Sequence, residues 1–310
     1  FLLQTTSADK YTNYLDPLRP GLLRSQYPYL YQNNVYERFK SFGASVQDIL
    51  YAEFHGNLSF SKDIWPGDNA DWTTWETYLQ NEYDRIKANN YKVDYEIWNE
   101  PDIKFFWGRT QQQFFETWKH GVMKMKVLDP KGRIVGPSIG VFSESYLQSV
   151  LQYAKTNNVL PDVLSWHELD SSQIDLIPEH VNSIKSWMQA QGIYIKEISI
   201  NETIGPLDTN NPGKIVNYFA SLEKAKINSA ARACWEEPSA NNISSCINYS
   251  LDGLLNAIDK KPRPSWWTYK AYSDLKGTLY NLTPTLSFDG LASYDTAYNS
   301  FTLLIGNKAH

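Results

Sequence analysis

Strand-like and helical segments alternate along most of the chain, and this alternation limits the fold more than any other feature. Short runs rich in Val, Ile, Leu and Tyr are followed by longer runs with apolar residues at helical spacing. The predicted strands are Phe1–Ser7, Pro20–Gln26, Ser45–Phe54, Lys92–Glu100, Arg133–Pro137, Asp162–Leu169, Lys196–Asn201 and Ser229–Trp235. The predicted helices are Ala8–Leu15, Asn33–Phe42, Trp72–Asn89, Thr110–Leu128, Ser143–Asn157, Pro178–Gln191, Pro212–Lys226, Leu251–Ala257 and Pro264–Leu275. Eight strands separated by helices favour parallel pairing and an α/β fold that closes into a (β/α)8 TIM barrel.

The end of the chain has a different pattern. From residue 278 onward, short β-type runs alternate with turn residues, and Asp289-Gly290 predicts a hairpin turn. We therefore predict a catalytic barrel over residues 1–277 and a β-rich segment over residues 278–310. Such a small sheet cannot bury a face by itself. It must pack on the barrel or begin a β-sandwich that the chain does not complete, and we expect the chain to be part of a longer product.

Net charge and hydropathy disfavour two classes of partner. The chain of 310 residues has a net charge of −5 and a pI of about 5.6, without a basic tract. This disfavours binding to nucleic acid and to anionic membranes. No apolar run approaches the length of a membrane span. The start at Phe1, without an initiator Met, predicts a processed or trimmed N-terminus.

The cysteines and the glycosylation sequons indicate the cellular compartment in which the protein works. Cys234 and Cys246 form a disulfide if the protein is secreted, and are otherwise two buried thiols. Together with the sequons they favour a secreted glycoprotein, with N-glycans predicted at Asn57, Asn242, Asn248 and Asn281. A fifth sequon, at Asn201, precedes a candidate catalytic residue, so we expect it to be unused.

The aromatic content is high, at 15% of the residues with 11 Trp and 21 Tyr. Aromatic rings stack on the apolar faces of sugars, so this composition fits a carbohydrate-binding protein. A large aromatic core is the other explanation.

The ends of the predicted strands carry the candidate functional residues. In a (β/α)8 barrel, functional groups collect at the C-terminal ends of the strands. These ends hold Arg24, His55, Asn99, Glu100, Trp166, His167, Glu168, Glu202 and Trp235. Glu100 ends the fourth predicted strand and Glu202 follows the seventh. Strands on roughly opposite sides of the barrel mouth can direct two carboxylates at one bond.

This arrangement resembles the clan A glycoside hydrolases, in which Asn-Glu ends one strand and a second Glu ends another. Trp98-Asn99-Glu100-Pro101-Asp102 is most similar to glycoside hydrolase family 39, the β-xylosidase and α-L-iduronidase family. The Trp266-Trp267 region and the β-rich tail also resemble that family, whose members carry a β-sandwich beside the barrel. Trp166-His167-Glu168 departs from the His-aromatic pattern expected after the sixth strand, which leaves the sugar and linkage open.

The resemblance implies a retaining hydrolase with two glutamates. By resemblance, Glu100 is the acid/base, Glu202 is the nucleophile, and Asn99 contacts the sugar 2-hydroxyl. An adjacent positive charge on Arg24 would favour ionisation of Glu202. Arg24 as an ordinary salt-bridge partner is the other interpretation.

Four further residues are predicted to bind substrate. His55 and His167 would orient sugar hydroxyls or a catalytic carboxyl, Trp166 would contact the sugar, and Trp235 would form the floor beneath it. Each could instead be an ordinary core residue.

Two other function classes compete with a retaining hydrolase. One is a catalytically inactive carbohydrate-binding barrel, although both glutamates are intact. The other is a metal-dependent barrel hydrolase, which five histidines without paired spacing disfavour. No cofactor and no metal are predicted.

Overall fold

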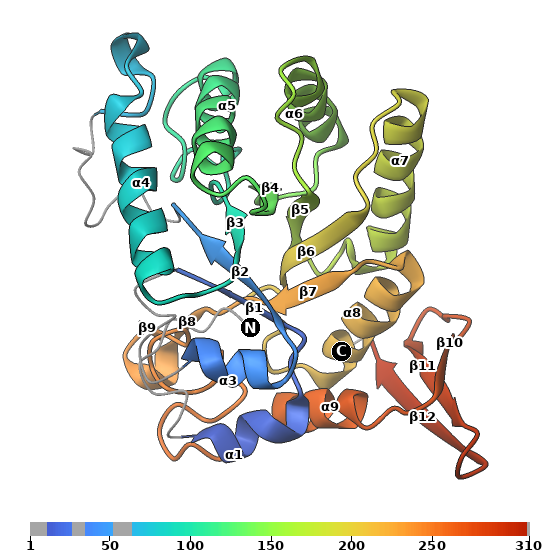
Figure 1. Ribbon diagram of the computed structural model, residues 1–310. Helices are drawn as coiled ribbons and strands as arrows, with labels where there is room; N and C mark the ends of the chain where they lie inside the picture. The colour runs from blue at the N-terminus through green and yellow to red at the C-terminus, as the bar shows by residue number, and fades with distance from the viewer. Residues whose placement is uncertain (1–10, 27–34, 52–63, 309–310) are drawn as a thin grey trace.

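The core of the molecule is a ring of parallel strands. A computed structural model describes residues 11–26, 35–51 and 64–308 (Figure 1). Within these ranges one sheet contains seven parallel strands in chain order: β1 (Leu22–Ser25), β2 (Ser45–Ile49), β3 (Asp94–Glu96), β4 (Ile134–Ile139), β5 (Val163–Glu168), β6 (Glu197–Thr203) and β7 (Ser229–Arg232). The two end strands, β1 and β7, lie next to each other, so the sheet is nearly closed. The predicted (β/α)8 barrel is confirmed; its first predicted strand, Phe1–Ser7, lies outside the described residues.

Helices follow most of the strands and cover the outside of the ring (Figure 1). They are α1 (Thr12–Leu15), α3 (Val35–Ser41), α4 (Thr73–Ala88), α5 (Gln111–Leu128), α6 (Glu144–Thr156), α7 (Ile177–Ala190), α8 (Pro212–Ala225) and α9 (Pro264–Ser273). Side chains cap three of them: Thr110, Ser143 and Asn211 each accept a hydrogen bond from the backbone N–H three residues later. Among the described residues, no helix is both long enough and apolar enough to cross a membrane.

The main apolar core lies between the strands and the helices. On α7, Ile177, Val181, Ile184 and Met188 form one buried stripe at helical spacing. All six residues of β5 are buried, as expected for a parallel sheet that helices cover. Each fully buried side chain of this kind stabilises the fold by roughly 1.5–3 kcal/mol.

Tryptophan side chains form a large part of this core. Trp75, Trp98 and Trp118 are almost fully buried, and the Trp98 ring stacks on Tyr51 with 4.3 Å between ring centroids. Core packing therefore accounts for these aromatic residues without any contact to a sugar.

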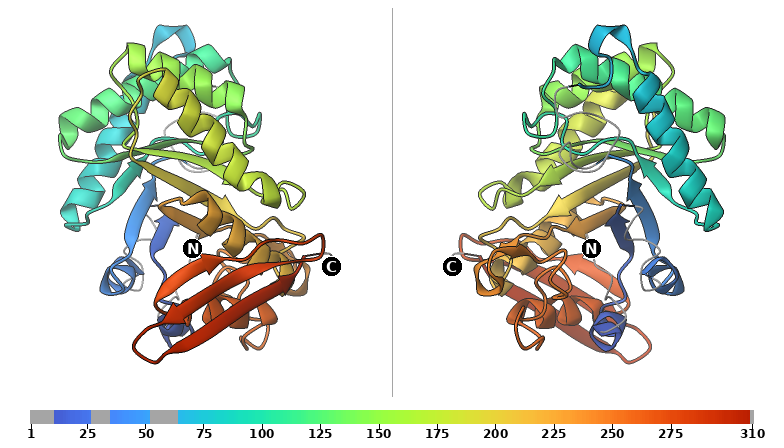
Figure 2. Two further views of the ribbon diagram at one scale, coloured as in Figure 1. Left: turned by 90° about the vertical axis from the view of Figure 1, so that its right-hand side faces the viewer. Right: turned by 90° about the vertical axis from the view of Figure 1, so that its left-hand side faces the viewer.

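The C-terminal segment forms a separate antiparallel sheet of β10 (Thr278–Asn281), β11 (Phe288–Asp295) and β12 (Ser300–Asn307). Figure 2 shows this sheet beside α8 and α9, on the far side of the molecule from α4. Glycines allow the close approach, because a Cβ atom on Gly213 of α8 would lie 1.8 Å from the backbone oxygen of Asn307. The sheet thus packs on the barrel, and the division of the chain into two domains at residue 277 stays a prediction.

The turn predicted at Asp289-Gly290 is wrong, because both residues lie inside β11. The Asp289 carboxylate accepts hydrogen bonds from Lys224 of α8 at 2.8 Å. A Cβ atom on Gly290 would lie 2.2 Å from the backbone oxygen of Leu304 in β12. The two residues therefore serve packing against neighbours that are distant in sequence.

The helix predicted over Leu251–Ala257 is also wrong. Leu251, Asp252 and Gly253 have φ angles of 51°, 54° and 79°, which a right-handed helix cannot contain. The segment forms turns instead, and Leu255 makes an antiparallel bridge with Pro262. The preceding loop contains the disulfide between Cys234 and Cys246, the first of the two states considered for these cysteines.

Candidate active site

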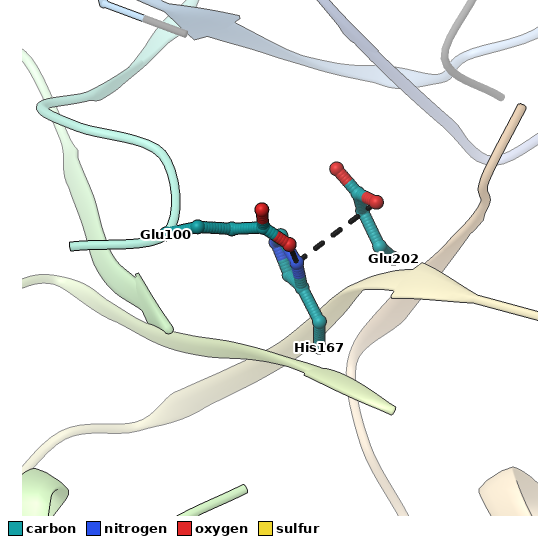
Figure 3. Close-up of side chains that lie close together, drawn as sticks. All are labelled: Glu100, His167 and Glu202. Atoms are coloured by element: carbon teal, nitrogen blue, oxygen red, sulfur yellow. Dashed lines mark hydrogen bonds and ion pairs between the residues drawn. The ribbon is translucent and has the colours of Figure 1, made fainter. Parts of the chain in front are cut away.

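Glu100 and Glu202 lie together at the C-terminal end of the barrel (Figure 3). Glu100 follows β3, and Glu202 is the next-to-last residue of β6. Their side chains are 13% and 14% exposed, so both are accessible without being surface residues. One carboxylate oxygen of each lies within 4.8 Å of the other. The structure thus brings together the two residues predicted to be catalytic.

The backbone at Glu100 has an unusual conformation. Its φ angle is 49°, in the left-handed region that costs a non-glycine residue about 1–3 kcal/mol. The Glu100 N–H donates to the backbone oxygen of Ser138 at 2.9 Å. Gly140 leaves room for the side chain, because a Cβ atom there would lie 2.9 Å from Glu100 Oε1. Strain of this kind is typical of functional sites.

Arg24 places a permanent positive charge beside Glu202. Arg24 Nη1 donates to Glu202 Oε1 at 2.6 Å, and the arginine is only 1% exposed. Burial alone would lower the pKa of Arg24, but the carboxylates of Glu96 and Glu202 outweigh it and raise that pKa above its ordinary value. Arg24 is therefore both a salt-bridge partner and a direct neighbour of the candidate nucleophile.

His167 lies between the two glutamates. Its Nδ1 atom is 2.8 Å from Glu100 Oε1 and 3.9 Å from Glu202 Oε2 (Figure 3). The ring is fully buried at the end of β5. His167 is thus placed to orient a catalytic carboxyl, which is one of the two roles predicted for it.

Asn99 is held by the same arginine. Its Oδ1 atom accepts a hydrogen bond from Arg24 Nη2 at 2.6 Å, and the residue is buried. This bond orients the Asn99 amide beside the two carboxylates. Its contact with a sugar hydroxyl stays a prediction.

The two predicted tryptophan contacts differ in position. Trp166 is fully buried, its ring packs on Phe142, and its Nε1 atom donates to Glu168 at 2.7 Å. The structure therefore contradicts a sugar contact for Trp166, because no ring surface is accessible. Trp235 is half-buried after β7 and donates to the backbone oxygen of Ile204 at 2.9 Å, so its role as a floor stays a prediction. His55 lies outside the described residues.

Glu96 belongs to the site, although its role was not predicted from the sequence. It is fully buried in β3 and accepts two hydrogen bonds from Arg24, at 2.6 and 2.5 Å. Asn201 Nδ2 also donates to it, at 3.0 Å. The sequence did contain a signal for this role: Asp94 and Glu96 alternate with Tyr95 and Ile97, which places the two acids on one face of the strand. Every second residue of a barrel strand points inward, and a buried acid requires a cation.

Asn201 and Ser138 extend this buried polar network. Asn201 Nδ2 donates to Ser138 Oγ at 3.0 Å, and Ser138 Oγ lies 2.7 Å from Ser165 Oγ. Asn201 is fully buried, which supports the expectation that its sequon is unused.

The other sequons differ in accessibility. Asn248 is also buried, and its Nδ2 atom, where a glycan would attach, donates to Glu237 at 3.2 Å. The structure thus contradicts a glycan at Asn248 in this conformation. Asn242 and Asn281 are exposed and stay predicted sites, and Asn57 lies outside the described residues.

The same cluster has the residue types of a metal site. Glu100, His167 and Glu202 offer ligand atoms that all lie within 4.8 Å of one another. The Arg24 guanidinium already contacts Glu202, and a metal ion would bring a second cation against it. We therefore assign no metal to this cluster.

Part of the chain matches the sequence model of a known enzyme family. The model for glycosyl hydrolases family 39 matches residues 78–201, a segment that contains Glu100 and ends just before Glu202. The resemblance to family 39 is confirmed. The matched segment covers the strands β3, β4 and β5 and most of β6.

Two curated relatives of the chain are large glycosidases. The chain is 28% identical over 271 residues to 3-O-alpha-D-galactosyl-alpha-L-arabinofuranosidase of Bifidobacterium longum subsp. longum, covering 84% of this chain and 22% of that protein. It is 27% identical over 246 residues to 3-O-beta-L-arabinopyranosyl-alpha-L-arabinofuranosidase of Bifidobacterium pseudocatenulatum, covering 77% and 22%. The chain thus spans about a fifth of the length of these relatives.

Solved structures share the fold. N2152 from Neocallimastix frontalis is 27% identical with a TM-score of 0.74, over 96% of this chain and 73% of that chain. The family 39 enzyme from Xanthomonas axonopodis pv. citri is 18% identical with a TM-score of 0.64, over 94% and 67%. At the latter identity, the likeness shows the fold alone.

Proposed function

We propose that the protein is a retaining glycoside hydrolase with Glu202 as nucleophile and Glu100 as acid/base. The observation that carries the proposal is the spacing of the two glutamates, whose carboxylate oxygens approach within 4.8 Å. Retaining glycosidases hold their carboxyl groups about 5–5.5 Å apart, whereas inverting enzymes need about 6.5–9.5 Å for an intervening water. The short spacing supports direct attack by a carboxylate.

In the first step, a carboxylate oxygen of Glu202 attacks the anomeric carbon and forms a covalent ester. The bond from that carbon to the leaving-group oxygen breaks, and the oxygen takes the proton from Glu100. Arg24 supports Glu202 as the nucleophile, because a permanent cation favours a carboxylate over a carboxylic acid.

In the second step, the Glu100 carboxylate removes a proton from water, whose oxygen attacks the anomeric carbon. The ester bond to Glu202 breaks, and Glu202 leaves as a carboxylate. The sugar keeps its original anomeric configuration after two inversions. Glu100 changes its proton in each step, and His167 is the neighbour that keeps its carboxyl in place.

α-L-Arabinofuranosides are our first choice of substrate class. The names of the two Bifidobacterium relatives described above are those of arabinofuranosidases. Xylosides, galactosides and glucosides belong in the same panel, because loops around the barrel mouth decide which sugar fits.

We further propose that the protein works in the secretory pathway or outside the cell. The Cys234–Cys246 disulfide supports this, because disulfides persist in oxidising compartments. Mapping of glycans on the natural protein tests it: sugar on Asn242 or Asn281 is expected, and sugar on Asn201 would contradict the site.

Hydrolysis of nitrophenyl glycosides, with the product anomer followed by NMR, tests the mechanism. Retention of configuration is expected, and inversion would contradict the proposal. An inactive carbohydrate-binding barrel would bind sugar without turnover in the wild type. Glu100→Gln and Glu202→Gln should lose turnover and keep sugar binding, and activity that survives a chelator would separate this mechanism from a metal-dependent one.

A further inference from the structure

One buried cation serves two carboxylates beneath the candidate active site. Arg24 Nε and Nη2 donate to Glu96 at 2.6 and 2.5 Å, and Nη1 donates to Glu202 at 2.6 Å. Arg24 and Glu96 are almost completely buried, whereas Glu202 reaches the mouth. The positive charge of Arg24 is therefore divided between the candidate nucleophile and a residue that no sugar can reach.

The paired hydrogen bonds also fix the arginine. A guanidinium is planar, so two parallel bonds to one carboxylate set the orientation of the whole group. With Nε and Nη2 held by Glu96, Nη1 is directed at Glu202, and Nη2 also reaches Asn99 Oδ1 at 2.6 Å. Asn201 Nδ2 holds the Glu96 carboxylate in turn.

We propose that Glu96 is a positioning residue that orients Arg24 and takes up part of its charge, so that the Glu202 carboxylate remains free to attack. This inference rests on the proposed function. An arginine paired with Glu202 alone would stabilise the carboxylate in the ground state. Attack on the anomeric carbon consumes the negative charge of Glu202, so that stabilisation would be lost in the transition state and would slow the reaction. Sharing Arg24 with Glu96 reduces this loss.

Other charged or titratable groups lie near Arg24, Glu96 and Glu202. His167 Nδ1 lies 3.9 Å from Glu202 Oε2, and Glu100 faces Glu202 across the mouth. The buried carboxyl of Asp48 in β2 also interacts electrostatically with Glu96. Glu96 is thus the group that both contacts Arg24 and lies outside the reach of substrate.

Glu96→Gln tests the charge, because it keeps the shape of the side chain and removes its negative charge. We expect kcat to fall about tenfold or more, with KM nearly unchanged, because the loss arises in the transition state. The acidic limb of the kcat/KM profile should move to lower pH by about one unit, because Arg24 then acts on Glu202 alone. A purely structural role predicts the opposite, since a displaced Arg24 would move that limb to higher pH.

Glu96→Asp separates charge from geometry and covers the case in which Glu96→Gln is unstable. It keeps the negative charge, so the acidic limb should stay near that of the wild type while kcat falls. Asp94→Asn is the matched control: Asp94 lies two residues earlier in β3 and pairs with Arg133 at 3.5 Å, away from the mouth. We expect wild-type kcat and an unchanged profile for the control.

The outcomes distinguish the two proposals. The role of Glu96 alone is overturned if the wild type hydrolyses glycosides with retention but the acidic limb of Glu96→Gln stays in place or moves to higher pH. The proposed function then stands. If Glu96→Gln does not fold, Glu96→Asp takes its place. A shift of its acidic kcat/KM limb away from that of the wild type overturns the role of Glu96. A wild-type protein that hydrolyses none of the glycosides overturns the proposed function and this inference together.

Discussion

The two sides of the candidate active site hold their glutamates by different means. Glu202 contacts the buried guanidinium of Arg24, a cation at every accessible pH, whereas Glu100 contacts the buried imidazole of His167. Glu202 lies within β6, whereas Glu100 lies on a strained turn after β3. One glutamate thus faces a fixed positive charge, and the other faces an imidazole ring. This asymmetry supports different roles for two identical side chains.

The largest expected effect comes from Glu202→Ala. Without the nucleophile the first step has no attacking group, so kcat should fall on the order of 10⁴-fold or more. Added azide can occupy the vacated space, attack from the same face, and give a glycosyl azide of inverted configuration. Product NMR measures this, and Glu179→Ala on the exposed face of α7 is the control. An azide product of retained configuration would reverse the roles of the two glutamates.

Glu100→Ala should cost less, and its effect should depend on the leaving group. General acid catalysis contributes about 10²–10⁴-fold, so poor leaving groups such as alkyl glycosides should lose that factor. Dinitrophenyl glycosides need no proton and should lose much less in the first step. Azide should here give a product of retained configuration. An equal loss of rate for good and poor leaving groups would show that Glu100 does not act as the general acid, and the proposed difference in role between Glu100 and Glu202 would fail.

His167→Gln should have a smaller effect, confined to the Glu100 side. Gln cannot carry a proton-dependent charge, and it loses the contact that holds Glu100 Oε1. We expect kcat/KM to fall about tenfold for poor leaving groups and little for activated ones. His120→Gln is the matched control, because His120 contacts Glu76 on the surface by an equivalent Nδ1 contact. A uniform loss across leaving groups would show that His167 acts mainly on Glu202.

The smallest expected effect concerns stability and arises at Asp48 of β2, the strand next to the one that holds Glu96. Burial, with the nearby charges of Glu82 and Glu96, raises the pKa of Asp48 well above its ordinary value. The folded state therefore holds this proton more tightly than the unfolded state, and the free energy of unfolding falls as pH rises from the ordinary Asp pKa toward the raised value. Asp48→Asn removes this loss.

Urea unfolding measures the effect at pH 4 and pH 8. Asp48→Asn should stabilise the protein by about 1–2 kcal/mol more at pH 8 than at pH 4. Asp84→Asn, on the exposed face of α4, should show no such difference. A gain that is equal at both pH values would mean that ionisation of Asp48 does not oppose folding.

Local patterns predicted much of this architecture. Alternating strand and helix segments identified the barrel, since periodicity reflects which face of an element is buried. Pro101 has no N–H to donate, so it predicted the end of a strand and placed Glu100 there, where a barrel carries its functional groups. In the structure β3 is shorter than the predicted strand Lys92–Glu100, because it ends at Glu96 and Glu100 lies in the turn that follows. The position of Glu202 followed from the same reasoning.

Long-range contacts explain the errors. A Trp near a strand end, such as Trp166, is typical of a sugar contact, but Phe142 and Glu168 contact Trp166 in the core. Asp289-Gly290 has the composition of a turn, but Lys224 and the backbone of β12 hold the pair inside a strand. A local motif contains no information about partners that the chain brings from elsewhere.

The sequence by itself determined the strand order and, with it, the two glutamates at the barrel mouth. Only the tertiary structure decided how each glutamate is held. Arg24 and Glu96 are 72 positions apart, and Arg24 and Glu202 are 178 apart, yet all three meet through one guanidinium. The reason is physical: a buried charge is tolerated only where the folded chain supplies its counter-charge, and closure of the barrel brings these charges together.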